Sequence, residues 1–311
     1  MTADDGYFDL QLNGYDGVDF NADTLEHDEV ARVCSRLVDE GTSGVLATVI
    51  TADIDVMCRR LENICKVRRA NSDVAEVIWG LHIEGPFLND QPGYIGAHPP
   101  DAAGPADADK MRRLLDAGEG LTRIVTIAPE RDDRFGVTRM LADQGICVSA
   151  GHCNPSLDQL RGAIDAGLSM FTHLGNGCPL QMHRHDNIIQ RVLSLSDHLS
   201  IGFIADGVHI PFHALGNYLA TTGTQRAFVV TDAIEAAGRG PGRFRVGGRS
   251  VVVDENLATW AEDRSHLVGS ALTMPTMVQH LRQQLNLSDE QIDQLTKRNP
   301  RAAVGMSGAD R

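Results

Sequence analysis

The feature that most constrains the fold is a repeated alternation, along the whole chain, of short β-rich runs with helical segments. Eight runs have the apolar, β-branched composition of buried strands, and helical patterns follow most of them. The expected strands are 8–12, 44–50, 77–83, 122–127, 146–150, 169–172, 199–204 and 226–230. Because parallel strands need crossover connections of this kind, the expected class is α/β.

The helical patterns complete the strand–helix units. They cover 53–69, 107–117, 132–144, 156–166 and 212–221, and two closing helices are expected at 270–285 and 288–298. Eight such units fit a (β/α)8 barrel of the TIM type, which needs about 250 residues. An open, doubly wound sheet is the competing arrangement. The barrel is favoured where polar residues at many strand ends converge on one mouth.

Nothing in the sequence divides the chain into separate modules. No repeat of fixed period or low-complexity tract interrupts it, so a single domain is expected over residues 1–311. The glycine-rich stretch Gly-Arg-Gly-Pro-Gly, which starts at Gly238, precedes an apolar run and predicts a β-hairpin inserted at about 238–256.

Composition and charge restrict the partners and the location. The chain has 28 Lys+Arg against 42 Asp+Glu, a formal charge of −14, which argues against a broad surface for nucleic acid or anionic membrane. It has no apolar run near the 20 or so residues of a membrane helix, and it starts without a signal-peptide pattern, so a cytoplasmic location is expected. The six scattered cysteines are expected to be reduced thiols.

Acidic and imidazole side chains follow five of the expected strands. They are Glu84, His152, His173, His209 and Asp232, after the third, fifth, sixth, seventh and eighth strands. In a barrel these strand ends surround one mouth, so the side chains would lie close together. Any one of these histidines could equally be a hydrogen-bonded structural residue. Their shared position at strand ends favours a functional cluster.

One carboxylate and two imidazoles make a suitable ligand set for a catalytic divalent metal ion. We expect Glu84, His152 and His173 to be these ligands, with an open position for water. Asp232 would be the general base that takes a proton from the water and returns it to the leaving group. Cys153 and Cys178 are expected to be packed apolar groups rather than nucleophiles.

Nine ordered motifs carry a family resemblance. They are Gln11-Leu-Asn-Gly, His82-Ile-Glu-Gly-Pro-Phe-Leu, Gly96-Ala-His-Pro-Pro, Ala150-Gly-His-Cys-Asn, Thr172-His-Leu-Gly-Asn-Gly, Ala205-Asp-Gly-Val-His, Val230-Thr-Asp-Ala, Leu267-Val-Gly-Ser-Ala-Leu-Thr-Met and Asn299-Pro-Arg-Ala-Ala. Together they resemble the N-acetylglucosamine-6-phosphate deacetylases of the amidohydrolase superfamily. The motifs span nearly the whole chain.

The resemblance implies roles for individual residues. Glu84, His152 and His173 match the metal ligands, and Asp232 matches the catalytic acid/base. Arg184 matches an arginine that reaches the substrate phosphate across a subunit boundary, which implies a homodimer. The matched substrate-binding positions are Ala97, His98, Asn176, Gly177, Arg184, His209, Leu267, Val268 and Gly269.

The end of the first strand carries Gln11 and Asn13 where many amidohydrolases have two histidines. Neutral amides are weak ligands for a zinc-like cation, so one metal ion per subunit is expected. Gln11 would then contact the metal-bound water, as in the mononuclear branch of the family. Zinc is the expected ion, and iron, cobalt or manganese would suit the same ligands.

The implied reaction is metal-dependent hydrolysis of the acetamide of N-acetyl-D-glucosamine 6-phosphate, giving D-glucosamine 6-phosphate and acetate in amino-sugar catabolism. The metal ion and His98 would stabilise the oxyanion. The alternatives are deacetylation of another N-acyl sugar and a non-catalytic sugar-phosphate-binding relative. The family's small accessory β-sandwich is expected to be missing or much reduced, which leaves open whether Arg184 acts in cis or in trans.

Overall fold

Eight parallel strands form a ring in the computed structural model, which describes residues 6–306. Each strand pairs with its neighbours in chain order. The strands are β1 (Tyr7–Leu12), β4 (Thr42–Ile50), β5 (Ile78–Glu84), β6 (Thr122–Ile127), β7 (Cys147–Ala150), β8 (Leu168–Phe171), β9 (Ser200–Ile204) and β10 (Ala227–Val230). The expected α/β class and the (β/α)8 barrel are confirmed, and all eight predicted strands are present with ends shifted by at most two residues.

The ring closes between β1 and β10 through a side chain. The Asp9 carboxylate accepts hydrogen bonds from the backbone N–H and the hydroxyl of Thr231, and Leu12 forms an isolated parallel bridge with Ala233. Burial raises the pKa of Asp9 to about 7. A carboxylate thus takes the place of regular strand pairing at the seam.

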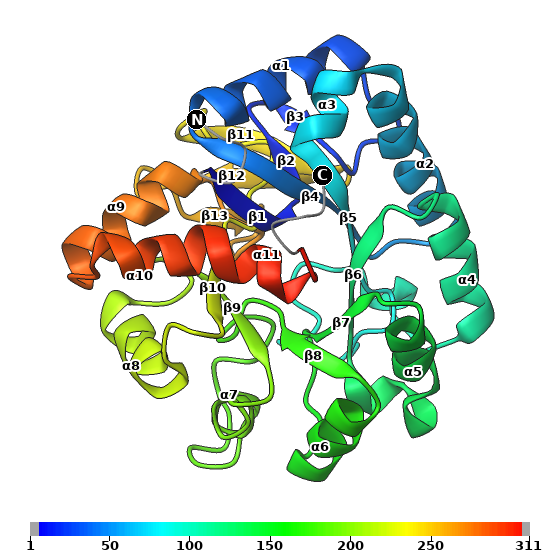
Figure 1. Ribbon diagram of the computed structural model, residues 1–311, viewed down its shortest axis with the longest axis vertical. Coiled ribbons are helices and arrows are strands. Elements are labelled where there is room, and N and C mark those ends of the chain that lie inside the picture. Colours follow the sequence, from blue (N-terminus) through cyan, green and yellow to red (C-terminus); the bar gives the residue numbers. More distant parts are fainter. Residues whose placement is uncertain (1–5, 307–311) are drawn as a thin grey trace.

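Helices lie outside the ring, as Figure 1 shows. They are α1 (His27–Asp39), α2 (Ile54–Ala70), α3 (Ser72–Val77), α4 (Ala108–Ala117), α5 (Gly136–Asp143), α6 (Leu157–Asp165), α7 (Ile188–Leu193), α8 (Phe212–Thr222) and α9 (Met274–Gln284). Their apolar faces cover the ring and enclose one continuous hydrophobic core. This layering leaves the two ends of the barrel as the sites where polar groups can meet.

The C-terminal segment covers the end of the barrel at which the strands begin. It consists of α10 (Asp289–Asp293), a π-helical turn (Gln294–Arg298) and α11 (Asn299–Ala303), seen in the foreground of Figure 1. The Asn299 amide donates to the carbonyl of Thr224 at 2.7 Å and to that of Ala227 at the start of β10. The Asn299-Pro motif therefore anchors this cover to the barrel.

Two expected helices begin later than the sequence predicts. The helix expected at 132–144 begins at Gly136, because Arg134 and Phe135 have left-handed backbone angles and the Asp132 carboxylate accepts from Val137 N and Thr138 N. The helix expected at 270–285 begins at Met274. Its first residues are instead extended, since Ser270 pairs with Ala233 in a parallel bridge.

The chain between β10 and α9 forms a small three-stranded sheet, separate from the barrel sheet. It contains β11 (Gly242–Val246), β12 (Arg249–Val253) and β13 (Thr259–Ala261), all antiparallel, and has its own apolar cluster. The segment expected to form a hairpin thus gains a third strand. Asp19, in the short hairpin of β2 (Gly14–Tyr15) and β3 (Val18–Asp19), accepts from Gly247 N at 2.7 Å and ties this sheet to the barrel.

The single domain expected over 1–311 stays a prediction, and its residues 1–5 and 307–311 lie outside the described residues.

The expectation of reduced cysteines agrees with the structure. All six cysteines are free, with Cys65 buried and Cys58 partly buried against the core. Between residues 6 and 306, none of the helices has the length and apolar character needed to cross a membrane.

Candidate metal and catalytic site

Four of the five predicted strand-end residues meet at the barrel mouth. Glu84 is the last residue of β5, while His152, His173 and Asp232 follow the ends of β7, β8 and β10 by two residues each. Glu84 Oε1 lies 3.1 Å from His173 Nε2 and 3.3 Å from His152 Nε2. The structure therefore brings together the residues expected to bind the metal ion.

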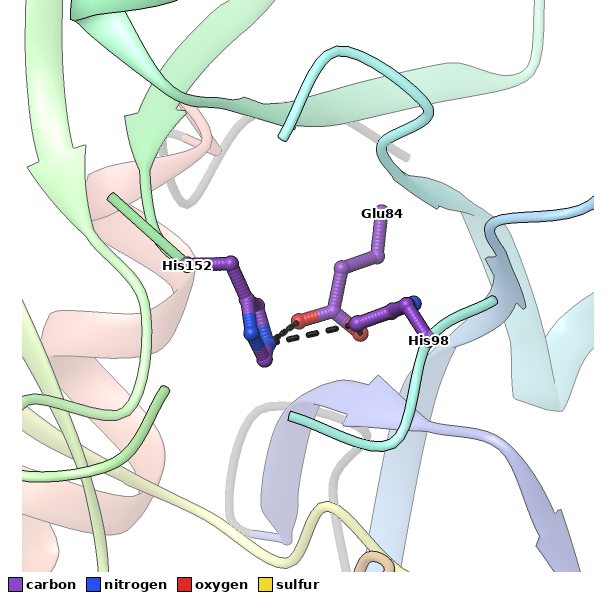
Figure 2. A group of neighbouring side chains, drawn as sticks. All are labelled: Glu84, His98 and His152. Carbon is purple, nitrogen blue, oxygen red and sulfur yellow. Dashed lines mark hydrogen bonds and ion pairs between the residues drawn. The ribbon is translucent and has the colours of Figure 1, made fainter. Parts of the chain in front are cut away.

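Glu84 is the centre of this cluster, and Figure 2 shows His98 and His152 on either side of its carboxylate. The residue is 3% exposed. Burial raises the pKa of the Glu84 carboxyl, but hydrogen bonds with His152 and His173 outweigh burial and hold the pKa well below its usual range. Glu84 is consequently an anion in a dry pocket, as a metal ligand needs to be.

A hydrogen bond to the main chain fixes the orientation of the His152 ring. Its Nδ1 lies 2.8 Å from the carbonyl oxygen of Tyr94, which can only accept a hydrogen bond. Nδ1 therefore donates to this carbonyl, and Nε2 is the ring nitrogen that faces Glu84. A backbone carbonyl behind an imidazole is a common arrangement for metal-binding histidines.

His98 joins the same cluster, although the sequence indicated only a substrate contact. Its Nε2 lies 3.2 Å from His152 Nε2 and 3.8 Å from Glu84 Oε2. Glu84, His98 and His152 have ligand atoms that all lie within 4.8 Å of one another. His173 contacts Glu84 but does not belong to that group of three, so two imidazoles compete for the role of third ligand.

The protonation of these imidazoles differs. Burial, followed by the charge of His152, lowers the pKa of His98 to about 3, so this ring is neutral near pH 7. Burial also lowers the pKa of His173, but the hydrogen bond and charge of Glu84 outweigh it and raise that pKa. Within the described chain, the Nδ1 atoms of both rings are buried without a partner.

Asp232 is held by two amides from β1 and the residue after it. Gln11 Nε2 donates to Asp232 Oδ1 at 3.0 Å and to Glu84 Oε1 at 3.2 Å, and Asn13 Nδ2 donates to Asp232 Oδ1 at 2.7 Å. Burial, followed by the negative charge of Glu84, raises the pKa of Asp232 to about 6. A carboxyl of this kind can take up and release a proton near neutral pH.

Asn13 was not among the predicted site residues, yet its amide contacts the proposed acid/base directly. The signal was present in the sequence, because Asn13 lies two residues after Gln11 and so points to the same side of an extended segment. Its Oδ1 is buried without a partner within residues 6–306. This oxygen is an available acceptor at the site.

Two glycines pack against the ring of His152. A methyl group on Gly96 would lie 2.9 Å from Cε1 of His152, and one on Gly177 would lie 2.8 Å from its Nδ1. Both glycines also have positive φ angles. The Asn176 amide donates to the carbonyl of His173 at 3.1 Å. These positions shape the pocket, and their sugar contacts stay a prediction.

Two of the predicted substrate-binding residues, Arg184 and His209, are in different surroundings. Arg184 is exposed on the loop between β8 and α7, and no ion pair to it is found in residues 6–306. The His209 side chain is 7% exposed and its Nδ1 lies 2.6 Å from Asp206 Oδ2. Asp206 also accepts from the backbone N–H groups of Val208 and His209, so it positions this imidazole.

The segment Leu267–Gly269 connects the small sheet to the barrel mouth. Leu267 forms an antiparallel bridge with Trp260, and Val268 N donates to Thr259 O. The next residue, Ser270, donates its N–H to the carbonyl of Asp232 at 2.8 Å. The main chain next to Leu267–Gly269 therefore adjoins Asp232, the candidate acid/base, which is consistent with the prediction that this segment lines the pocket. Ala97, beside His98, is partly buried.

Comparison with known proteins adds independent information. No protein-family model matches the chain. The chain is 32% identical to the N-acetylglucosamine-6-phosphate deacetylase of Bacillus subtilis, over 97% of this chain and 75% of that protein. It is also 32% identical to the N-acetylgalactosamine-6-phosphate deacetylase of Shewanella sp., over 95% of this chain and 72% of that protein.

A solved structure is similar over the same extent. It is a variant of the N-acetyl-D-glucosamine-6-phosphate deacetylase of Mycobacterium smegmatis in complex with N-acetyl-D-glucosamine 6-phosphate. The TM-score is 0.86 at 30% identity, and the match covers 97% of this chain and 77% of that one. The similarity thus extends over nearly the whole of this chain.

Proposed function

The chain belongs to the N-acetylglucosamine-6-phosphate deacetylase family, and we propose that its barrel-mouth site hydrolyses the acetamide of N-acetyl-D-glucosamine 6-phosphate. The products would be D-glucosamine 6-phosphate and acetate, in amino-sugar catabolism. The observation that carries this proposal is the buried Glu84 with its imidazoles, placed beside an Asp232 whose pKa is about 6.

The residues present fit a divalent cation. Glu84 is a buried anion, and the Tyr94 carbonyl orients the His152 ring so that its Nε2 faces Glu84. We propose Glu84, His152 and His173 as ligands, with one zinc ion per subunit as the expected occupant and iron, cobalt or manganese as alternatives. When bound, such a cation supplies Lewis acidity toward the acetamide carbonyl and the attacking water.

Asp232 would transfer the proton from the attacking water to the departing amine. Gln11 and Asn13 both donate to its Oδ1, so Oδ2 is the oxygen left to take a proton from the attacking water. The same oxygen can deliver that proton to the nitrogen of the departing amine. Gln11 also donates to Glu84 and keeps the two carboxylates at a fixed separation. His98, neutral near pH 7, would donate from Nε2 to the developing oxyanion.

Recognition of the sugar phosphate would use the remaining positions. Arg184, exposed on its loop, has a guanidinium suited to phosphate oxygens and could act within its own subunit or in the partner of a homodimer. His209, held by Asp206, and Asn176 with Gly177 would bind the sugar phosphate from the barrel side. The main-chain groups of Ala97 and of Leu267–Gly269 would line the pocket.

A second substrate is favoured by one observation. The relative from Shewanella sp. is named for N-acetylgalactosamine 6-phosphate, and its identity to this chain equals that of the Bacillus subtilis relative. Sequence identity to these two relatives therefore does not decide between N-acetylglucosamine 6-phosphate and its C4 epimer, N-acetylgalactosamine 6-phosphate. The same metal and acid/base groups would serve both sugars.

The deciding experiment compares acetate release from four compounds by the purified protein. They are the 6-phosphates of N-acetylglucosamine and N-acetylgalactosamine and the two unphosphorylated sugars. We expect the highest kcat/KM on N-acetylglucosamine 6-phosphate. Equal values with and without phosphate would contradict the phosphate assignment, and a preference for the galacto epimer would replace the proposed substrate. A cytoplasmic location, also proposed, would be checked by cell fractionation.

A further inference from the structure

Arg60, in the second turn of α2, is a buried arginine for which the described residues provide no partner. The residue is only 6% exposed. Its Nε is enclosed without a hydrogen bond from residues 6–306, while its two terminal nitrogens are accessible to solvent and form no ion pair with those residues. Burial lowers the pKa of Arg60 below its usual range. The enclosed Nε–H has no acceptor and most of the side chain is shielded from water, so an anion bound at the accessible terminal nitrogens would stabilise the Arg60 charge.

The guanidinium of Arg60 lies at the mouth end of the barrel. A methyl group on Gly247, in the turn between β11 and β12, would be 3.7 Å from Arg60 Nη2 and 3.8 Å from Nη1. The same methyl would be 3.5 Å from Ile50, the last residue of β4. Arg60 therefore faces the small inserted sheet at the end of the barrel where the strands terminate.

A second arginine stands on that sheet. Arg249, the first residue of β12, donates from Nη1 to the carbonyl oxygen of Ala97, beside His98. Burial lowers the pKa of Arg249, and the charge of Arg249 is among the influences that lower the pKa of Arg60. Arg249 begins the strand that follows the Gly247 turn, and the Arg60 guanidinium packs against that turn, so the two arginines flank the same turn.

The acidic groups nearby leave this pair of charges incompletely neutralised. Asp19 and Asp23 act on Arg60 through their charges, but neither forms an ion pair with it. The Asp19 carboxylate already accepts hydrogen bonds from Asn21 N at 2.8 Å and from Gly247 N at 2.7 Å. These hydrogen bonds hold the Asp19 carboxylate on the turn, and it forms no ion pair with Arg60.

We propose that Arg60 and Arg249 form a binding site for a phosphate-type oxyanion at the rim of the barrel mouth, separate from the cluster around Glu84. The forked guanidinium groups match the oxygens of a tetrahedral oxyanion. The oxyanion would be a free inorganic phosphate ion or the phosphate ester of a sugar. Because Arg249 also contacts Ala97, the bound anion would stiffen the loop that carries His98.

The test measures thermal unfolding of the full chain with increasing inorganic phosphate and, separately, with glucosamine 6-phosphate. Wild type is expected to be stabilised by phosphate, since a ligand of the folded state raises the unfolding temperature. Arg60→Met should unfold at a higher temperature than wild type without phosphate, and its apparent phosphate affinity should be at least tenfold weaker. If Arg60 has only a structural role, Arg60→Met should unfold at a lower temperature than wild type in the absence of phosphate.

Two further variants complete the design. Arg249→Met changes an exposed residue, so it should fold and should also weaken phosphate binding. Arg184→Ala lies at the separately proposed substrate-phosphate position and should keep the Arg60-dependent response. A wild-type response to both ligands in Arg60→Met, or in Arg249→Met if Arg60→Met does not fold, would overturn the proposal. A response to the sugar ester alone would identify the ester as the ligand.

The readout is independent of turnover. A protein that binds phosphate through Arg60 but releases no acetate would contradict the proposed hydrolysis and support this site. A protein that releases acetate, and that phosphate still stabilises after Arg60 is replaced, would support the proposed hydrolysis and contradict this site.

Discussion

At the scale of single residues, three side chains of the candidate site have unusual backbone angles. His152, His173 and Asp232 have φ values of 51°, 32° and 48°. Left-handed angles of this kind cost roughly 1–3 kcal/mol each in a residue other than glycine, and they persist only where the surrounding structure enforces them. Each of these residues follows the end of a strand by two positions, so the sharp turn directs its side chain across the mouth.

The identity of the third metal ligand can be tested by removing each candidate imidazole. We expect His173→Gln to reduce the metal content from about one to well below one per subunit, because it removes a proposed ligand. His98→Gln is the matched control and should keep its metal while kcat falls. Metal analysis of both purified variants measures this, and loss of metal only in His98→Gln would assign the third ligand to His98.

Asp232→Asn separates proton transfer from metal binding. The new amide can still accept from Gln11 and Asn13 through its oxygen, so the geometry should be retained. We expect unchanged metal content and a kcat lower by a factor of roughly 10² to 10⁴, since a general acid/base typically contributes that much. Steady-state kinetics and metal analysis on the same preparation measure both quantities. A kcat near that of wild type would exclude Asp232 as the acid/base.

At the scale of elements, most of the candidate site could be predicted because it follows strand ends. Glu84 ends one apolar run whose composition identifies a strand, and Asp232 follows another such run by two residues. The helix α1 could also have been found, since Val30, Val33, Cys34 and Leu37 repeat at helical spacing and are all buried. The late start of α5 could not, because it depends on how the Asp132 carboxylate folds back on later N–H groups.

The loop between β8 and α7 carries the proposed phosphate contact. Arg184→Ala should raise KM for the phosphorylated substrate at least tenfold and leave the unphosphorylated sugar unaffected, because an exposed guanidinium contributes only to phosphate binding. Arg184→Lys keeps the charge and should recover part of the loss. An unchanged KM in Arg184→Ala would mean that the loop residue is merely solvated.

The same loop residue allows a test of subunit exchange. Arg184→Ala and Asp232→Asn would be mixed after dissociation and reassembly. If Arg184 acts across a homodimer interface, mixed dimers contain one site with both groups intact, and activity should recover to a fraction of the wild-type value. No recovery in verified mixed dimers would indicate that Arg184 acts within its own subunit.

At the scale of the whole molecule, closure of the barrel depends on the buried Asp9. Burial raises its pKa from 3.8 to about 7, so the folded protein binds this proton more tightly than the unfolded chain does. The contribution of Asp9 to the free energy of unfolding is therefore full below about pH 4 and declines as the pH rises toward 7. About three pKa units correspond to a decline on the order of 4 kcal/mol.

Asp9→Asn removes this titration and leaves an oxygen that can accept from the N–H groups of Gln11 and Thr231. The difference in unfolding free energy between variant and wild type should shift in favour of the variant between pH 5 and pH 8. Urea denaturation at several pH values measures it. A difference that stays constant over that range would show that Asp9 does not titrate at the seam.

The sequence by itself determined the eight strands, most of the helices that follow them and the family, because local pattern identifies the elements and the motifs stay in order along the chain. Only the tertiary structure decided that His98 packs against His152, that Asn13 holds Asp232, and that the Arg60 Nε is enclosed without a partner among residues 6–306. These facts depend on which side chains meet across the mouth. Such contacts join residues far apart in the chain, and local pattern carries no record of them.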